Sequence, residues 1–197
     1  MRKVYLWINL LAGILIAASQ ISAPAQAADS LPPNVPARYS AVAFGQAGSA
    51  AGKSFGLTIS VDGVTPDGDR DELVATLKSK GQNGLLSAIE DLKDKGRVSP
   101  TGSVGTGMRV VRIRPLPNGG QHIVLVTDRP LSFGEVYYNT RSRDYPFAIV
   151  VLNIDQNGKG TGSLAPLCRI TFNKKQEIEI ENFGQKPFRL TNVRRDK

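Results

Sequence analysis

The feature that most constrains the fold of this chain is a two-residue alternation of apolar and polar side chains. It is clearest in the segment FGLTISV, residues 55–61, where every second side chain is large and apolar. Successive side chains of a β-strand point to opposite faces, so this pattern predicts a strand that is buried on one face. The following Asp62-Gly63 pair is typical of a turn and ends the strand.

The same alternation, with turn residues between the segments, recurs over most of the chain. Residues 146–155 form the most apolar run after the N-terminal region, which predicts a central strand. In residues 177–181, acidic residues alternate with Ile178 and Ile180, so we expect one wet acidic face and one buried face. The expected strands are residues 38–44, 55–61, 108–114, 121–127, 131–139, 146–155, 163–172, 177–181 and 186–193.

Residues 69–95 interrupt the strands with a helical pattern. Asp69 and Glu72 fit a capping box, apolar residues then recur at helical spacing, and Gly81 follows the first helix. Residues 84–95 repeat this arrangement and stop at Gly96, which predicts a helix hairpin. No strand–helix–strand alternation is present, so the expected fold class is mainly β (α+β). We expect an antiparallel barrel or sandwich of about eight or nine strands with the helix hairpin inserted near residues 69–95.

The N-terminal region predicts export. Residues 1–27 contain Arg2 and Lys3, then an apolar run over residues 4–18, then Ala25-Gln26-Ala27, which are the three parts of a secretory signal peptide. Cleavage near Ala27 predicts a secreted or periplasmic protein without a transmembrane segment in the mature chain. Residues 28–36 are a proline-rich lead-in, and residues 37–197 are expected to form a single β-rich domain.

Charge and cysteine content narrow the classes of partner. Removal of Arg2 and Lys3 lowers the formal net charge from +8 to +6, which favours acidic partners; nucleic acid would be an unusual target for an exported protein. Cys168 is the only cysteine, so no intrachain disulfide forms. Because Cys168 alternates with Ile170 and Phe172, a buried and inert thiol is expected.

Several motifs suggest chemistry, but their context does not support it. Residues 47–54 match a relaxed phosphate-loop pattern, yet a strand is predicted where the mechanism needs a helix. Residues 67–72 resemble the start of a calcium loop but lack its glycine and its final glutamate, and residues 155–160 fit a hairpin turn. His122 is the only histidine and starts a predicted strand, where a structural role is expected. No catalytic residue, metal site or cofactor is assigned.

Arginine in the middle of the chain gives the best candidate surface. No lysine lies between Lys95 and Lys159, so every formal positive charge there is an arginine, and arginine binds carboxylate and phosphate groups bidentately. The loop at Arg141, Arg143 and Tyr145 joins two expected strands at a rim, and Tyr137 lies on the strand that leads into it. These four are the predicted ligand-binding residues. The alternative is a set of local pairs between arginines and carboxylates: Asp128, Glu135 and Asp144 each lie beside an arginine or tyrosine.

Three functional hypotheses follow. The first is an exported, non-enzymatic binding or interaction module whose Arg/Tyr surface holds an anionic partner, such as an acidic glycan, a lipid headgroup or protein carboxylates of the envelope. The second is a lipocalin-like carrier with a small apolar ligand inside a β-barrel. The third is an envelope hydrolase, for which the sequence shows no motif. The oligomeric state is left open.

Overall fold

A computed structural model describes residues 35–132, 144–183 and 186–196. Within these ranges the chain forms antiparallel strands, one α-helix and one short 3-10 helix, which confirms the predicted mainly β fold class. The helices are η1 (Gly48–Ala50) and α1 (Asp67–Glu90). The strands are β1 (Ala37–Phe44), β2 (Ser54–Val61), β3 (Gly96–Pro100), β4 (Thr106–Met108), β5 (Val110–Pro115), β6 (Gln121–Thr127), β7 (Phe147–Ile154), β8 (Lys159–Phe172), β9 (Ile178–Asn182) and β10 (Phe188–Arg195).

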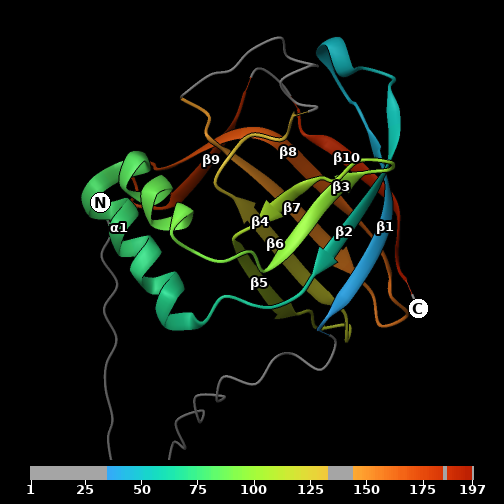
Figure 1. Ribbon diagram of the computed structural model, residues 1–197, viewed down its shortest axis with the longest axis horizontal. Helices are drawn as coiled ribbons and strands as arrows, with labels where there is room; N and C mark the ends of the chain where they lie inside the picture. The colour runs from blue at the N-terminus through green and yellow to red at the C-terminus, as the bar shows by residue number, and fades with distance from the viewer. Residues whose placement is uncertain (1–34, 133–143, 184–185, 197) are drawn as a thin grey trace, which may run out of the picture. The chain divides into compact units, whose positions relative to one another are not determined.

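The strands form a nearly closed barrel (Figure 1). Hydrogen-bonded neighbours follow the order β4-β3-β2-β1-β10-β8-β7-β6-β5, and β9 also pairs with β8. The two ends of this order, β4 and β5, are consecutive in the chain and are separated only by Arg109. The Arg109 backbone N–H donates to the carbonyl of Val126 on β6 at 2.9 Å, which continues the β5–β6 ladder. The chain itself therefore bridges the two sheet edges, and the architecture is a barrel and not a sandwich.

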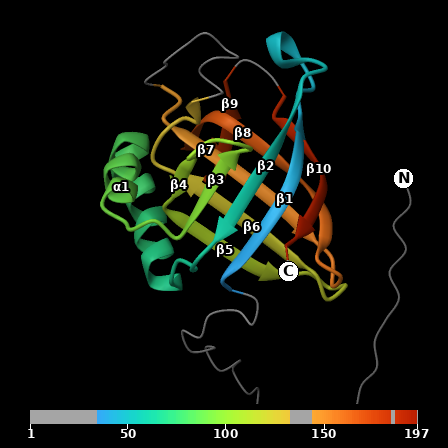
Figure 2. The ribbon, with the colours of Figure 1, turned by 45° about the vertical axis from the view of Figure 1, so that its right-hand side comes forward.

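Strand β8 is long enough to pair with two strands in succession. Its first half pairs with β10, with Leu164 opposite Phe188, and its second half pairs with β9, with Cys168 opposite Asn182. Figure 2 shows β10 beside β1, while β8 and β9 continue past it. Strand β9 has β8 as its only hydrogen-bonded neighbour among the described strands, which leaves its other edge uncovered.

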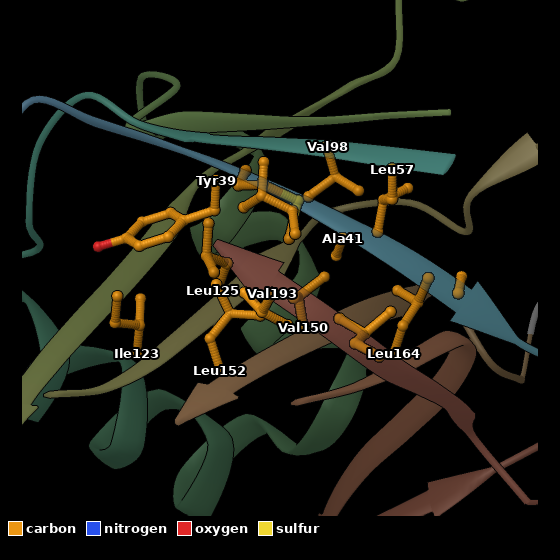
Figure 3. Close-up of a cluster of buried hydrophobic side chains, with 14 of the residues drawn as sticks. Tyr39, Ala41, Leu57, Val98, Ile123, Leu125, Val150, Leu152, Leu164 and Val193 are labelled. Atoms are coloured by element: carbon orange, nitrogen blue, oxygen red, sulfur yellow. The ribbon is translucent and has the colours of Figure 1, made fainter. Parts of the chain in front are cut away.

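The interior of the barrel is a packed hydrophobic core (Figure 3). Its side chains come from every wall of the barrel and are almost completely removed from solvent; they include Tyr39, Ile59, Val98, Leu125, Val150, Leu152, Leu164 and Val193. Fully burying one such aliphatic side chain contributes about 1.5–3 kcal/mol. These inward residues occupy alternate positions of their strands, which is the pattern that the sequence predicted for residues 55–61.

Helix α1 packs on the outside of the barrel (Figure 1). Its buried residues recur at helical spacing and contact the outer faces of β7 and β8; they are Leu73, Leu77, Leu85 and Ile89. The helix is interrupted at Gly81, where φ is 67° and ψ is −165°. The predicted helix hairpin is therefore observed as two helical segments that meet at this glycine.

The side chain of Gln82 fixes the interruption to the sheet. Its amide nitrogen donates to the carbonyl of Asp144 at 3.1 Å, and its oxygen accepts from the N–H of Ile170 at 3.3 Å. The predicted end of the second segment at Lys95 is wrong, because α1 ends at Glu90. The reason is that the backbone of Lys95 already pairs with Met108 and with Asp62.

The structure differs from the predicted strands at residues 96–100 and 131–132. Strand β3 was not predicted, because Val98 is its only inward-facing apolar residue and β3 is held by its pairing with β2. The predicted strand at residues 131–139 lies, from residue 133 on, outside the described residues. Leu131 itself is buried in an irregular segment, and its N–H donates to the carbonyl of Pro166 at 3.0 Å. In the part of the chain described above, no helix has the length and apolarity needed to span a bilayer.

Candidate functional site

The arginines of the middle region separate into distinct places and do not form one patch. Arg97, Arg109 and Arg129 lie around the point where the barrel closes. Arg112 and Arg114 project from the outer face of β5, next to α1. Arg141 and Arg143 lie outside the described residues, as does Tyr137. Three of the four predicted ligand-binding residues are therefore not part of the site geometry that follows.

The first group is an ion-pair network. The Arg109 guanidinium lies 3.2 Å from Oδ1 of Asp94 and 3.4 Å from Oδ2 of Asp128, and it also donates to the carbonyl of Leu92. Arg129 forms two hydrogen bonds to Asp128, at 3.1 Å and 3.3 Å. The expectation that Asp128 pairs with a neighbouring arginine is confirmed. This network joins the segment after α1 to the β4–β5 junction and to the end of β6, so it stabilises barrel closure.

Asp128 is the buried centre of this network, with a side chain only 5% exposed. Burial by itself would raise the pKa of its carboxyl group. The hydrogen bonds and positive charge of Arg129, together with the charge of Arg109, outweigh that effect and lower the pKa. Its negative charge is thus already neutralised by two arginines, which makes these arginines poor candidates for binding an external anion.

Tyr145, the one predicted site residue that is described, is also engaged inside the protein. Its hydroxyl donates to Oε1 of Glu181 at 2.5 Å, and Glu181 accepts a further hydrogen bond from Nε of Arg169 at 2.8 Å. The Arg169 guanidinium lies over the Tyr145 ring, 5.5 Å from its centroid, and Phe183 packs edge-on at 5.1 Å. Hydrogen bonds from Tyr145 and then Arg169 lower the pKa of Glu181. The guanidinium group of Arg169 is therefore already paired with a carboxylate of the protein.

The second group forms a positive cluster that we call the arginine triad: Arg70, Arg112 and Arg114. Arg112 and Arg114 are exposed and point outward from β5, while Arg70 faces them from the first turn of α1. Arg70 pairs with Asp67. Among the described residues, neither Arg112 nor Arg114 has a hydrogen bond or ion pair through its guanidinium group.

The charges within the triad repel each other. Partial burial and then the positive charges of Arg70 and Arg114 lower the pKa of Arg112, while Asp67 and Asp71 act in the opposite direction. Arginine remains protonated at any physiological pH. The net result is a site where an added anion would relieve like-charge repulsion. The sequence placed Arg112 and Arg114 on one face, but it did not indicate that Arg70 would join them.

An apolar groove extends from the triad between α1 and the outer face of the barrel. It has a volume of about 420 Å³, and its lining combines the triad with aliphatic side chains of α1, β5, β6 and β9. Ile178 and Ile180 of β9 line it and are 50% and 48% exposed. The prediction that these two residues would be buried is wrong. Strand β9 has β8 as its only paired neighbour among the described strands, and both isoleucines remain half exposed beside the groove.

A second hollow lies at one end of the barrel, beneath the turns that contain Gly119 and Gly158. It encloses about 920 Å³, and the buried Tyr39 lines it together with Arg195 and Asp196. Burial raises the pKa of Tyr39, and the charge of Arg195 partly offsets this. Many of its lining residues belong to turns, and the lining contains both positive and negative side chains. The chemistry of this hollow therefore indicates a class of ligand less clearly than the chemistry of the groove does.

Other residues that the sequence singled out have structural environments. Nδ1 of His122 lies 2.7 Å from the side-chain oxygen of Asn153 on the outer face of β6 and β7. Burial raises the pKa of the Cys168 thiol to about 12, in agreement with an inert cysteine. Residues 47–54 lead through η1 into a strand, so they lack the helix of a phosphate loop. The described residues contain no group of three or more His, Cys, Asp or Glu side chains placed to hold a metal ion.

Comparison with known proteins identifies no family. No family model, no curated protein and no solved structure matches the chain.

Proposed function

We propose that this protein is an exported, non-enzymatic binding module that holds an anionic partner, and that the arginine triad provides the binding charge. The observation that carries the proposal is the convergence of three guanidinium groups at one end of a groove, two of them without a carboxylate partner among the described residues. Arginine binds carboxylate, sulfate or phosphate through two parallel hydrogen bonds, and such charge-assisted bonds are about twice as strong as neutral ones.

Export supports the choice of an anionic envelope component or protein as the partner. It is inferred from residues 1–27 of the sequence, which lie outside the described residues. Of the three hypotheses drawn from the sequence, the anion-binding module is the one supported by a described surface on which two neighbouring arginines, Arg112 and Arg114, form no ion pair with any described residue. The side chains that fill the middle of the barrel support this proposal over a lipocalin-like carrier, which would need a ligand chamber there.

The test compares paired arginine variants that lose the same charge. Heparin serves as a polyanionic probe, and the measurement is the salt concentration at which each protein elutes from immobilised heparin. Arg112→Ala with Arg114→Ala is expected to elute clearly earlier than the parent protein. The matched control, Arg189→Ala with Arg194→Ala, removes two exposed arginines of β10 and is expected to elute close to the parent.

A third pair, Arg141→Ala with Arg143→Ala, tests the loop predicted from the sequence. If this pair causes the larger shift, the loop is the binding surface and the triad is not. Equal elution of the triad pair and the β10 pair would show that only net charge matters, which would contradict the proposal. Thermal unfolding of each variant, followed by circular dichroism, establishes that the arginines were removed from folded protein.

A further inference from the structure

We infer that the anionic partner is a single-chain amphiphile, with its acidic head group on the arginine triad and its hydrocarbon tail in the apolar groove. This inference rests on the proposed function, because it uses the same arginines. It adds the chemical class of the ligand and a second set of contacts. It also assigns a purpose to apolar side chains that the fold leaves exposed.

The exposed apolar residues provide the first argument. Three of the large hydrophobic side chains that remain exposed among the described residues line this one groove: Val74 at 42%, Ile178 at 50% and Ile180 at 48%. Scattered exposed hydrophobic residues need no explanation, but a group that borders a hollow indicates a binding site. Burying these side chains against a hydrocarbon tail would remove them from water without any change in the fold.

The arrangement of polarity along the groove is the second argument. The strands of this outer face follow the order β5-β6-β7-β8-β9. Arg112 and Arg114 are on β5 at one edge, and Ile178 and Ile180 are on β9 at the other. The polarity of the groove lining therefore changes from arginine on β5 to isoleucine on β9, as the polarity of an amphiphile changes from its head group to its hydrocarbon tail.

The cross-strand registers show how the change in polarity is built. Val110, Val126, Ile149 and Ala165 lie side by side across the outer face and are apolar. Four residues further along β5, Arg114 lies opposite His122, which in turn lies opposite Asn153. The outer face thus changes from aliphatic to hydrogen-bonding within a few residues. An amphiphile has the same sequence of properties, from tail to head.

The size of the groove favours a small molecule over a protein segment. Its volume of about 420 Å³ falls within the range of about 300–1,000 Å³ that is usual for small-ligand pockets. An α-helix with its side chains is about 10 Å across and would not fit beside α1 at this volume. A tail without a charged head would leave the triad uncompensated, and an anion without a tail would leave the isoleucines exposed.

The experiment measures affinity against chain length by isothermal titration calorimetry. The probes are decanoate, dodecanoate and tetradecanoate, each below its critical micelle concentration, with 1-dodecanol and acetate as matched ligands that lack the charge or the tail. Each added methylene is expected to increase affinity about fourfold, by conversion of the transfer free energy of one buried methylene. Dodecanol and acetate are expected to bind far more weakly than dodecanoate.

Two variants separate the tail contacts from the head contacts. Val74→Ser with Ile180→Ser makes the groove polar at two exposed positions, where the substitutions should not disturb the buried core. This variant is expected to reduce dodecanoate affinity at least tenfold and to leave heparin elution unchanged. Arg112→Ala with Arg114→Ala is expected to reduce both. Val104→Ser, at a position that is 84% exposed outside the groove, is the control and should change neither.

The outcomes distinguish this inference from the proposed function. If removal of Arg112 and Arg114 lowers the elution salt concentration on heparin no more than removal of Arg189 and Arg194 does, both the proposed function and the amphiphile are overturned. A heparin shift without any dependence on chain length would overturn the amphiphile alone. Light scattering measures the oligomeric state of the parent protein and of the Val74→Ser, Ile180→Ser variant. If the parent is a dimer and the variant a monomer, the groove is an interface between two copies of the chain, and the amphiphile proposal is overturned. If deletion of residues 28–34 is needed before dodecanoate binds, the lead-in segment is the natural occupant, which also overturns the inference.

Discussion

At the scale of single residues, Asp128 is the side chain on which barrel closure most depends. Its carboxylate lies almost buried between Arg109 and Arg129 and also accepts a hydrogen bond from the Thr127 hydroxyl at 3.1 Å. A charged hydrogen-bonding group that is lost from such a position leaves its partners unsatisfied. Closure is therefore secured by a polar network on the outside of the barrel and by packing on the inside.

We expect Asp128→Asn to lower the free energy of unfolding by about 2 kcal/mol, because a neutral amide replaces a carboxylate that binds two guanidinium groups. Chemical denaturation with urea measures the change. Glu179→Gln, at an exposed position of β9, is the control and is expected to stay within about 0.5 kcal/mol of the parent. A loss no larger than that of the control would show that the network contributes nothing to stability.

The same residue predicts an acid dependence. Since the pKa of Asp128 is lower in the folded protein than its ordinary value of 3.8, its contribution to stability is fully present above that value. The contribution disappears as the pH falls through the lowered folded pKa. Stability of the parent should therefore decrease more steeply below about pH 4 than that of Asp128→Asn. Parallel pH profiles of the two proteins would contradict this assignment.

At the scale of elements, the interruption of α1 decides where the helix covers the barrel. Gly81 has a backbone conformation with φ of 67° and ψ of −165°, a region that side-chain-bearing residues rarely adopt. Gln82 then fixes this point to Ile170 and Asp144. The junction of the two helical segments is thus hydrogen-bonded to β8 through Ile170.

We expect Gly81→Ala to destabilise the protein by about 1–3 kcal/mol, because alanine is strained in that conformation. Gly68→Ala in the same helix is the matched control: Gly68 is helical, and an added methyl group there would meet nothing within 4 Å. Its expected effect is neutral or stabilising, by up to about 1 kcal/mol, because alanine favours helix. Thermal unfolding compares the two. Equal effects would mean that the conformation at Gly81 imposes no constraint.

At the scale of the whole molecule, the barrel has a packed hydrophobic core. Leu125 is completely buried among the inward-facing side chains. We expect Leu125→Ala to cost about 2–5 kcal/mol, the usual effect of a cavity in a packed core. For a chain of this size, each kcal/mol lowers the melting temperature by about 2–4 °C, so differential scanning calorimetry would resolve it.

The control for this prediction is Val104→Ala at an exposed loop position, which is expected to change the melting temperature very little. The comparison also bears on the lipocalin-like alternative. If the centre of the barrel were a ligand chamber, truncating Leu125 would enlarge the chamber at little cost in stability. A near-neutral Leu125→Ala would therefore revive the carrier hypothesis and weaken the proposal of an external site.

Local patterns of side chains predicted most of the buried faces and most of the turns. Alternation predicted most of the strands, helical spacing predicted the inserted helices, and Gly81 marked their interruption. These features are local, so they can be read from periodicity. Which strands pair and which face of the barrel the helix covers depend on contacts between segments that are distant in the chain. Closure through Arg109 is a pairing of distant segments, and it gave Arg97, Arg109 and Arg129 carboxylate partners.

The candidate site follows the same division. Arg112 and Arg114 share a face by strand periodicity, but Arg70 reaches them only because α1 packs on that side of the barrel. Ile178 and Ile180 have the pattern of a buried face, yet β9 lies at an edge that no described element covers. The periodicity of a sequence shows which face of a strand or helix is apolar. Whether another element packs on that face depends on contacts between distant parts of the chain. A groove with arginines at one end and isoleucines at the other is therefore a property of the folded molecule alone.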